Sequence, residues 1–198
     1  MEINNSKLAE LVRGAKSAGA SDARVVEVSS IVVDDGLAEK CVEPRCPNYG
    51  LALSCPPNVE GPDGFRDKLK HFTKAIAVRL DVPYKLLYSK ESYTAFKRLG
   101  ELAVEVEELA VEAGFKDALA YTGGSCKVIF CKDEERCRAL TEGGECRHPR
   151  YARRSTSGYG VDVAALAAEA GWKLSWSGVE PEDGGGKVAS VYGLVLVY

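Results

Sequence analysis

The pattern of hydrophobic and polar positions predicts helices and strands that alternate along the chain. Between Leu8 and Ala15, apolar residues recur at intervals of three and four, which predicts a helix over residues 6–18 that ends at Gly19. Residues 23–33 are rich in β-branched side chains in an alternating pattern, which is typical of a strand. The N-terminal part of the chain therefore begins as helix and then strand.

The same patterns predict four further elements in the middle of the chain. They are a short helix over residues 62–72, a strand over 74–82, a long helix over 89–113 and a strand over 117–124. The long helix has the strongest signal, because apolar residues recur at helical spacing with charged residues on the opposite face.

The C-terminal part predicts a helix that starts at Asp162 and ends at Gly171, followed by two strands, Trp172–Trp176 and Val188–Tyr198. The glycine run over 184–186 marks the turn between these two strands, which we expect to pair antiparallel. Together the elements predict an α/β or α+β fold, with a mixed sheet flanked by helices in a single domain over residues 1–198.

Two segments depart from these patterns, and both are rich in cysteine. Residues 41–62 and 124–160 are interrupted by Pro and Gly, which predicts loops. All seven cysteines of the chain fall in these loops: Cys41, Cys46 and Cys55 in the first, and Cys126, Cys131, Cys137 and Cys146 in the second. Thiolates gathered in loops are typical of metal or iron-sulfur sites, and an odd number argues against a closed disulfide framework. We therefore predict that all seven are metal ligands.

The four-cysteine set predicts one complete cluster, preferably [4Fe-4S], with zinc as the alternative cofactor. Its spacings lack the C-x-x-C element of most zinc ribbons and ferredoxins. The three-cysteine set, Cys41, Cys46 and Cys55, would leave one iron without a cysteine ligand. A cysteine of the other set, a different side chain or an exchangeable ligand could complete that site.

The two histidines differ in their surroundings. His148 lies two residues after Cys146, and we expect it to donate a hydrogen bond to a cluster sulfur rather than to bind metal. His71 lies at a predicted helix end, where a capping or solvated role is expected.

The net charge and the hydropathy of the chain indicate which kinds of partner it can bind and where in the cell we expect it. A net charge of −3 argues against a generally basic nucleic-acid binder, although residues 126–154 carry eight Lys and Arg against five Asp and Glu. These cations could stabilise cluster thiolates, or the stretch 150–160 could bind an anion. No apolar run is long enough to span a membrane and no secretory signal is recognisable, so we expect a cytoplasmic protein whose thiols stay reduced.

Several short motifs in combination resemble a known family. They are CPNYG over residues 46–50, SCPP over 54–57, GSC over 124–126, CRHP over 146–149 and GVDV over 160–163. In this combination the chain resembles the DUF2284 family of predicted metal-binding proteins over roughly residues 40–172. The resemblance implies cysteine-bound iron-sulfur centres in a cytoplasmic protein.

Three functions compete on this basis. The first is an iron-sulfur protein, with one or two [4Fe-4S] clusters, that acts in electron transfer or as a redox accessory to a partner protein. The second is an enzyme in which Cys41, Cys46 and Cys55 hold a cluster whose open iron acts as a Lewis acid on a small-molecule substrate. The third is a zinc-stabilised binding module.

Overall fold

The computed structural model describes residues 5–141, 143–174 and 188–198, and contains a mixed five-stranded sheet. The strand order is β1-β2-β5-β3-β4, in which the β3–β4 pair is parallel and the other neighbours are antiparallel. The strands are β1 (Asp22–Glu27), β2 (Lys74–Pro83), β3 (Leu119–Thr122), β4 (Arg154–Ser155) and β5 (Val188–Leu196). The α+β fold class predicted from the sequence is thus confirmed.

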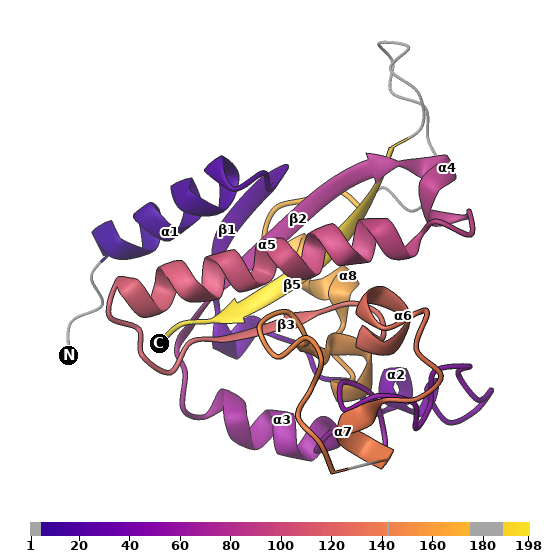
Figure 1. The fold of residues 1–198 in the computed structure, drawn as a ribbon. Helices are drawn as coiled ribbons and strands as arrows, with labels where there is room; N and C mark the ends of the chain where they lie inside the picture. Colours follow the sequence, from indigo (N-terminus) through magenta and orange to yellow (C-terminus); the bar gives the residue numbers. More distant parts are fainter. Residues whose placement is uncertain (1–4, 142, 175–187) are drawn as a thin grey trace.

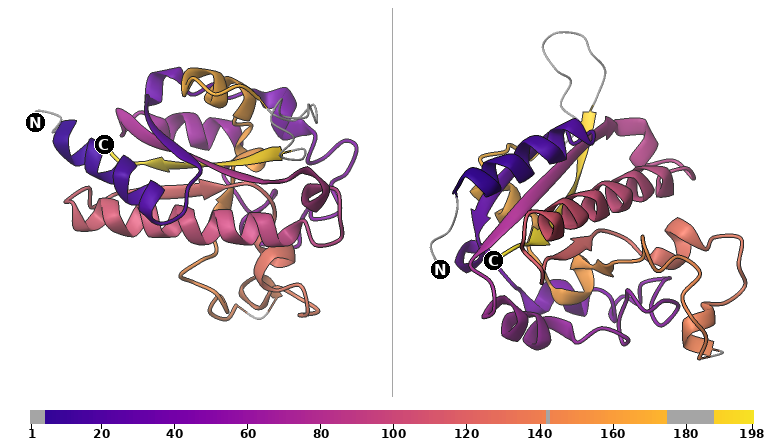
Figure 2. Two further views of the ribbon diagram at one scale, coloured as in Figure 1. Left: turned by 90° about the horizontal axis from the view of Figure 1, so that it is seen from above. Right: turned by 60° about the vertical axis from the view of Figure 1, so that its left-hand side comes forward.

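Helices cover both faces of the sheet (Figures 1 and 2). On one face, α1 (Asn5–Ser17) and α5 (Tyr93–Glu112) bury apolar side chains such as Leu8 and Leu102 against β2. On the other face, α3 (Gly61–Leu69) and α8 (Val163–Glu169) pack a core that contains Phe65. None of the described helices is long and apolar enough to cross a membrane.

Most elements predicted from periodicity are found within a few residues of their expected bounds. The expected strand over residues 23–33, however, ends early: β1 stops at Glu27 and a 3₁₀-helix, Val28–Ser30, follows. Only Val33 returns to a β-bridge, opposite Val161. The apolar side chains that suggested a longer strand are still used, because Val28 and Ile31 are buried in the core.

The predicted pairing of the last two strands is wrong. β5 lies between β2 and β3 and bonds to both of them. Residues 172–174 form no strand, because the ring of Trp172 is used as core, stacked on Tyr192 with a centroid distance of 5.9 Å. Residues 175 and 176, and the predicted glycine turn over 184–186, lie outside the described residues.

Four short helices escaped prediction because each is too short for a helical repeat. They are α2 (Asp35–Glu39), α4 (Tyr84–Leu87), α6 (Cys126–Phe130) and α7 (Arg138–Thr141). Three of them, α2, α6 and α7, flank or lie within the cysteine-rich segments, which converge at the β3–β4 side of the sheet (Figure 1).

The parallel β3–β4 pair positions these segments. Thr122 of β3 lies opposite Ser155 of β4, so the end of β3 and the chain leaving the second loop run side by side. The Ser155 N–H bonds to the carbonyl of Ser54 in the first loop at 2.9 Å. Both cysteine loops are therefore tied to the same edge of the sheet.

Candidate metal centre

The first cysteine loop folds around a cavity of about 80 Å³ that Cys41, Cys46 and Cys55 line together. Successive turns shape the loop: the Cys46 N–H bonds to the Cys41 carbonyl at 3.1 Å, and the Cys55 N–H bonds to the Ala52 carbonyl at 3.2 Å. Cys55 is 8% exposed, whereas Cys41 and Cys46 are half-buried. The three cysteines predicted to act as one set are thus brought together.

The remaining wall of this three-thiol cavity carries no cysteine among the described residues. It consists of small, polar and aromatic residues: Asn48, Tyr49, Pro56, Gly124, Ser125, Ser155, Ser157 and Gly158. Gly158 is required here by close packing, because a Cβ on it would lie 2.9 Å from Pro56 Cδ. The second cysteine loop thereby closes over the first.

The second set surrounds a smaller cavity, of about 20 Å³, lined by Cys126, Cys131, Cys137 and Cys146. Burial raises the pKa of the Cys131 thiol, and neighbouring Cys146 and Cys137 raise it further, whereas the cations of Arg147 and Lys127 oppose the shift. The four thiols therefore lie close enough to influence one another, with cations among them.

His148 lies at this four-thiol cavity, and its backbone contacts a sulfur. The His148 N–H donates to Cys146 Sγ at 3.4 Å. Its ring lies beside Phe130, with 5.9 Å between the ring centroids. This contact with a cysteine sulfur comes from the main chain, and the hydrogen bond expected from the imidazole to a cluster sulfur stays a prediction. His71, by contrast, is exposed just after α3.

A serine joins the two sets. Ser54 Oγ accepts the Cys126 N–H at 3.1 Å and lies 3.7 Å from Cys55 Sγ. Ser54 is 3% exposed, so this link is buried. Two Ser-Cys pairs, Ser54–Cys55 and Ser125–Cys126, meet here. Ser125 lines the three-thiol cavity together with Cys55, and Ser54 lies with Cys126 in the wall of a larger neighbouring cavity.

Electrostatics also indicate that the sets are neighbours. Burial raises the pKa of the Cys126 thiol, the Ser54 hydrogen bonds oppose the shift, and both Cys55 and Cys137 raise it further. The pKa of Cys126 is therefore affected by one thiol of each set, Cys55 of the first and Cys137 of the second. Burial likewise raises the pKa of Cys41, with added contributions from Cys46 and Cys55.

The thiols of each set line a cavity and do not converge on a point. Within residues 5–141, 143–174 and 188–198, no group of three or more His, Cys, Asp or Glu side chains is placed to hold one metal ion.

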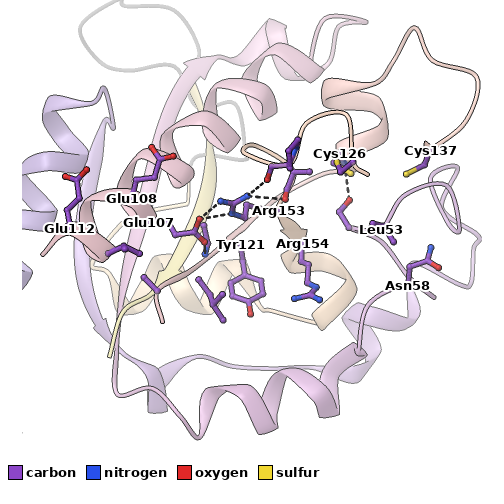
Figure 3. Close-up of a pocket in the computed structure, with 18 residues that line it drawn as sticks. Leu53, Asn58, Glu107, Glu108, Glu112, Tyr121, Cys126, Cys137, Arg153 and Arg154 are labelled. Atoms are coloured by element: carbon purple, nitrogen blue, oxygen red, sulfur yellow. Dashed lines mark hydrogen bonds and ion pairs between the residues drawn. The ribbon is translucent and has the colours of Figure 1, made fainter. Parts of the chain in front are cut away.

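A larger cavity, of about 840 Å³, adjoins the four-thiol set (Figure 3). Cys126, Cys137 and Cys146 line one end, and α5 residues including Glu112 line the other. Its volume lies within the range of small-molecule sites.

Two ion pairs fasten the second loop to α5 along this cavity. Arg153 donates to Glu107, with Nε 2.8 Å from Oε2, and the other Glu107 oxygen accepts the Ala120 N–H at 2.6 Å. Arg150 holds Glu108 through two bonds of 2.9 Å. The cations of residues 150–154 thus have carboxylate partners, including Glu60 for Arg154.

Comparison with known proteins identifies the family. A family model described as "predicted metal-binding protein" matches residues 24–197, which include all seven cysteines. The chain belongs to the DUF2284 family. No curated protein and no solved structure matches this DUF2284 chain. Membership of this family supports metal binding, but the family description does not specify which metal.

Three residues of this site were not singled out from the sequence of the DUF2284 protein: Ser54, Ser125 and Glu107. A signal existed for the serines, because each directly precedes a cysteine in a quoted motif, SCPP or GSC. Glu107 gave none, since a glutamate in a long amphipathic helix is normally solvated.

Proposed function

We propose that this protein binds two iron-sulfur clusters of the [4Fe-4S] type and passes single electrons between them and a redox partner. The observation that carries the proposal is that the two cysteine sets line separate cavities joined by one buried serine. Adjacent clusters held this way would form a short relay.

The donor sets favour iron-sulfur clusters over zinc. A structural zinc site brings four protein ligands to one ion, whereas the thiols of neither set converge on one point among the described residues. Cluster sulfurs are tuned by burial, N–H donors and nearby cations. Buried Cys55, the N–H of His148 on Cys146 and the cations Lys127 and Arg147 supply all three features.

The residues of the chain would act by holding and insulating the clusters. When bound, the clusters supply the one-electron chemistry. Ser54 keeps the loops in contact, since its hydroxyl accepts the Cys126 N–H and its carbonyl accepts the Ser155 N–H. Arg150 and Arg153 fasten the second loop to α5, which limits its movement during electron transfer.

An enzyme is the second candidate, and the 840 Å³ cavity favours it. This cavity adjoins the four-thiol set, whereas the sequence suggested a reactive iron at Cys41, Cys46 and Cys55. A small-molecule substrate in the cavity would therefore meet the complete site and could exchange electrons with it.

Metal analysis tests the proposal. Anaerobically purified protein should contain close to eight iron and eight acid-labile sulfide per chain, on the order of two [4Fe-4S] centres. Stoichiometric zinc without sulfide would overturn the proposal and leave the zinc-stabilised binding module. A change in the reduced protein's paramagnetic spectrum on adding a small molecule would favour the enzyme.

A further inference from the structure

One residue in the wall of the three-thiol cavity has a buried side-chain oxygen that lacks a hydrogen-bond partner among the described residues. Ser125 lines this cavity, is 4% exposed and has a buried Oγ without a partner in the described part of the chain. Burying a hydroxyl without a hydrogen-bond partner costs folding free energy, and native proteins normally satisfy such a group with a protein atom, an ordered water, an ion or a ligand.

The other polar residues of the wall are in different situations. Ser157 is exposed, and the ring of Tyr49 lies under the Arg45 guanidinium at 5.0 Å. Among the described residues that line the cavity, Ser125 therefore supplies the buried side-chain oxygen that lacks a partner.

The backbone fixes where Ser125 lies. It follows Gly124, whose φ of +82° is a left-handed conformation that favours glycine. The next residue, Cys126, lines the four-thiol cavity and has its N–H held by Ser54. The conformation of Gly124 on one side and the hydrogen bond of Cys126 on the other therefore fix the position of Ser125 between the two cysteine sets.

We propose that Ser125 Oγ is the fourth protein ligand of the cluster held by Cys41, Cys46 and Cys55. The inference rests on the proposed iron-sulfur function and completes its three-thiol site. An Fe–O bond forms as a solvent ligand leaves that iron, and the hydroxyl proton passes to water. No change of oxidation state is involved.

An oxygen ligand makes this iron distinct from the other three. Oxygen is a harder ligand than thiolate, and soft thiolates are the preferred ligands of iron-sulfur clusters. The iron on Ser125 should therefore be held less firmly than a thiolate-bound iron, but more firmly than one that has only solvent as its fourth ligand.

Three variants, each prepared anaerobically and loaded with iron and sulfide, test the assignment during controlled exposure to air. Ser125→Ala should lose one iron from this site at least roughly tenfold faster than the wild type and give a three-iron species, the scale on which a missing partner weakens a metal site. Ser125→Cys should lose it more slowly than the wild type. Ser157→Ala, which removes an exposed hydroxyl from the same cavity, should match the wild type.

The results separate this proposal from the one on which it rests. Equal rates of iron loss in Ser125→Ala and wild type would overturn serine ligation, while wild type without iron and sulfide would overturn the iron-sulfur function itself. If Ser125→Ala does not fold, Ser125→Cys decides through its Mössbauer spectrum. A change confined to one iron supports ligation, and an unchanged spectrum contradicts it.

Discussion

Removing the Glu107 carboxylate should loosen the second cysteine loop. The side chain of Glu107 is 11% exposed and that of its partner Arg153 is 21% exposed. The same carboxylate accepts the backbone N–H of Ala120 in β3. Glu107→Ala therefore leaves a largely buried guanidinium and a buried N–H without their acceptor.

Breaking a buried ion pair from one side costs about 3–5 kcal/mol, and we expect the lower end because Arg153 keeps some solvent and two carbonyl acceptors. A loss of about 3 kcal/mol would lower the Tm by roughly 6–12 °C in a chain of this size. Urea unfolding followed by far-UV circular dichroism measures the free energy directly.

The neighbouring residue provides a matched control. Glu108 pairs with Arg150 on the same helix and loop, but both side chains are exposed, at 43% and 58%. Glu108→Ala should change the unfolding free energy far less, because solvent screens exposed pairs. Equal losses in Glu107→Ala and Glu108→Ala would refute the role given to burial.

Three further predictions concern the cysteine loops and the sheet. Cys131→Ala should lower the iron content by about half, because the free energy of metal binding is also what orders the second cysteine loop. Unchanged iron and sulfide in this variant would contradict the four-thiol site. Ser54→Ala should lower the unfolding free energy by about 1–3 kcal/mol, measured in urea, because its hydroxyl accepts a backbone N–H of the other loop. Burial would raise the pKa of Asp22, but hydrogen bonds from Lys16 and Trp172 outweigh it and lower the pKa from 3.8 to about 2. The ionised Asp22 carboxylate therefore stabilises the fold fully above about pH 4, and this stabilisation is lost as the pH falls through about 2. Asp22→Asn should have a lower free energy of unfolding at neutral pH, and that free energy should change less with pH between about 4 and 2 than it does in the wild type.

Periodicity predicted the fold well where one face of an element is buried over many residues. The long helix α5 was found close to its expected bounds because its buried positions recur at helical spacing. The strand β2 was found because it is rich in apolar and β-branched residues, although residues 75–78 are buried without alternation. Short elements carry too few residues for a period, which is why α6 was missed. The predicted pairing of a strand at Trp172 with β5 was wrong. The sequence shows that Trp172 is apolar, but not whether its ring belongs to a strand or packs against the face of the sheet, as it does on Tyr192.

The grouping of the cysteines in the candidate site could be predicted from the sequence, but the contacts that join the two groups could not. Clustering in the sequence grouped the cysteines, and the structure places each set around one cavity. The link through Ser54 joins residues 72 positions apart, and the Glu107–Arg153 pair joins residues 46 positions apart. Such long-range polar contacts depend on the packed fold and leave no local pattern in the sequence.

The central claim is that two clusters lie side by side, and electron paramagnetic resonance of the fully reduced protein tests it most directly. Two adjacent reduced clusters should give a spectrum broadened by spin–spin interaction, because Cys55 and Cys126 of the two sets share Ser54. Variants that remove either cysteine set should give the simple spectrum of one isolated cluster. A wild-type spectrum equal to the sum of two such isolated spectra, or one without any cluster signal, would contradict the account.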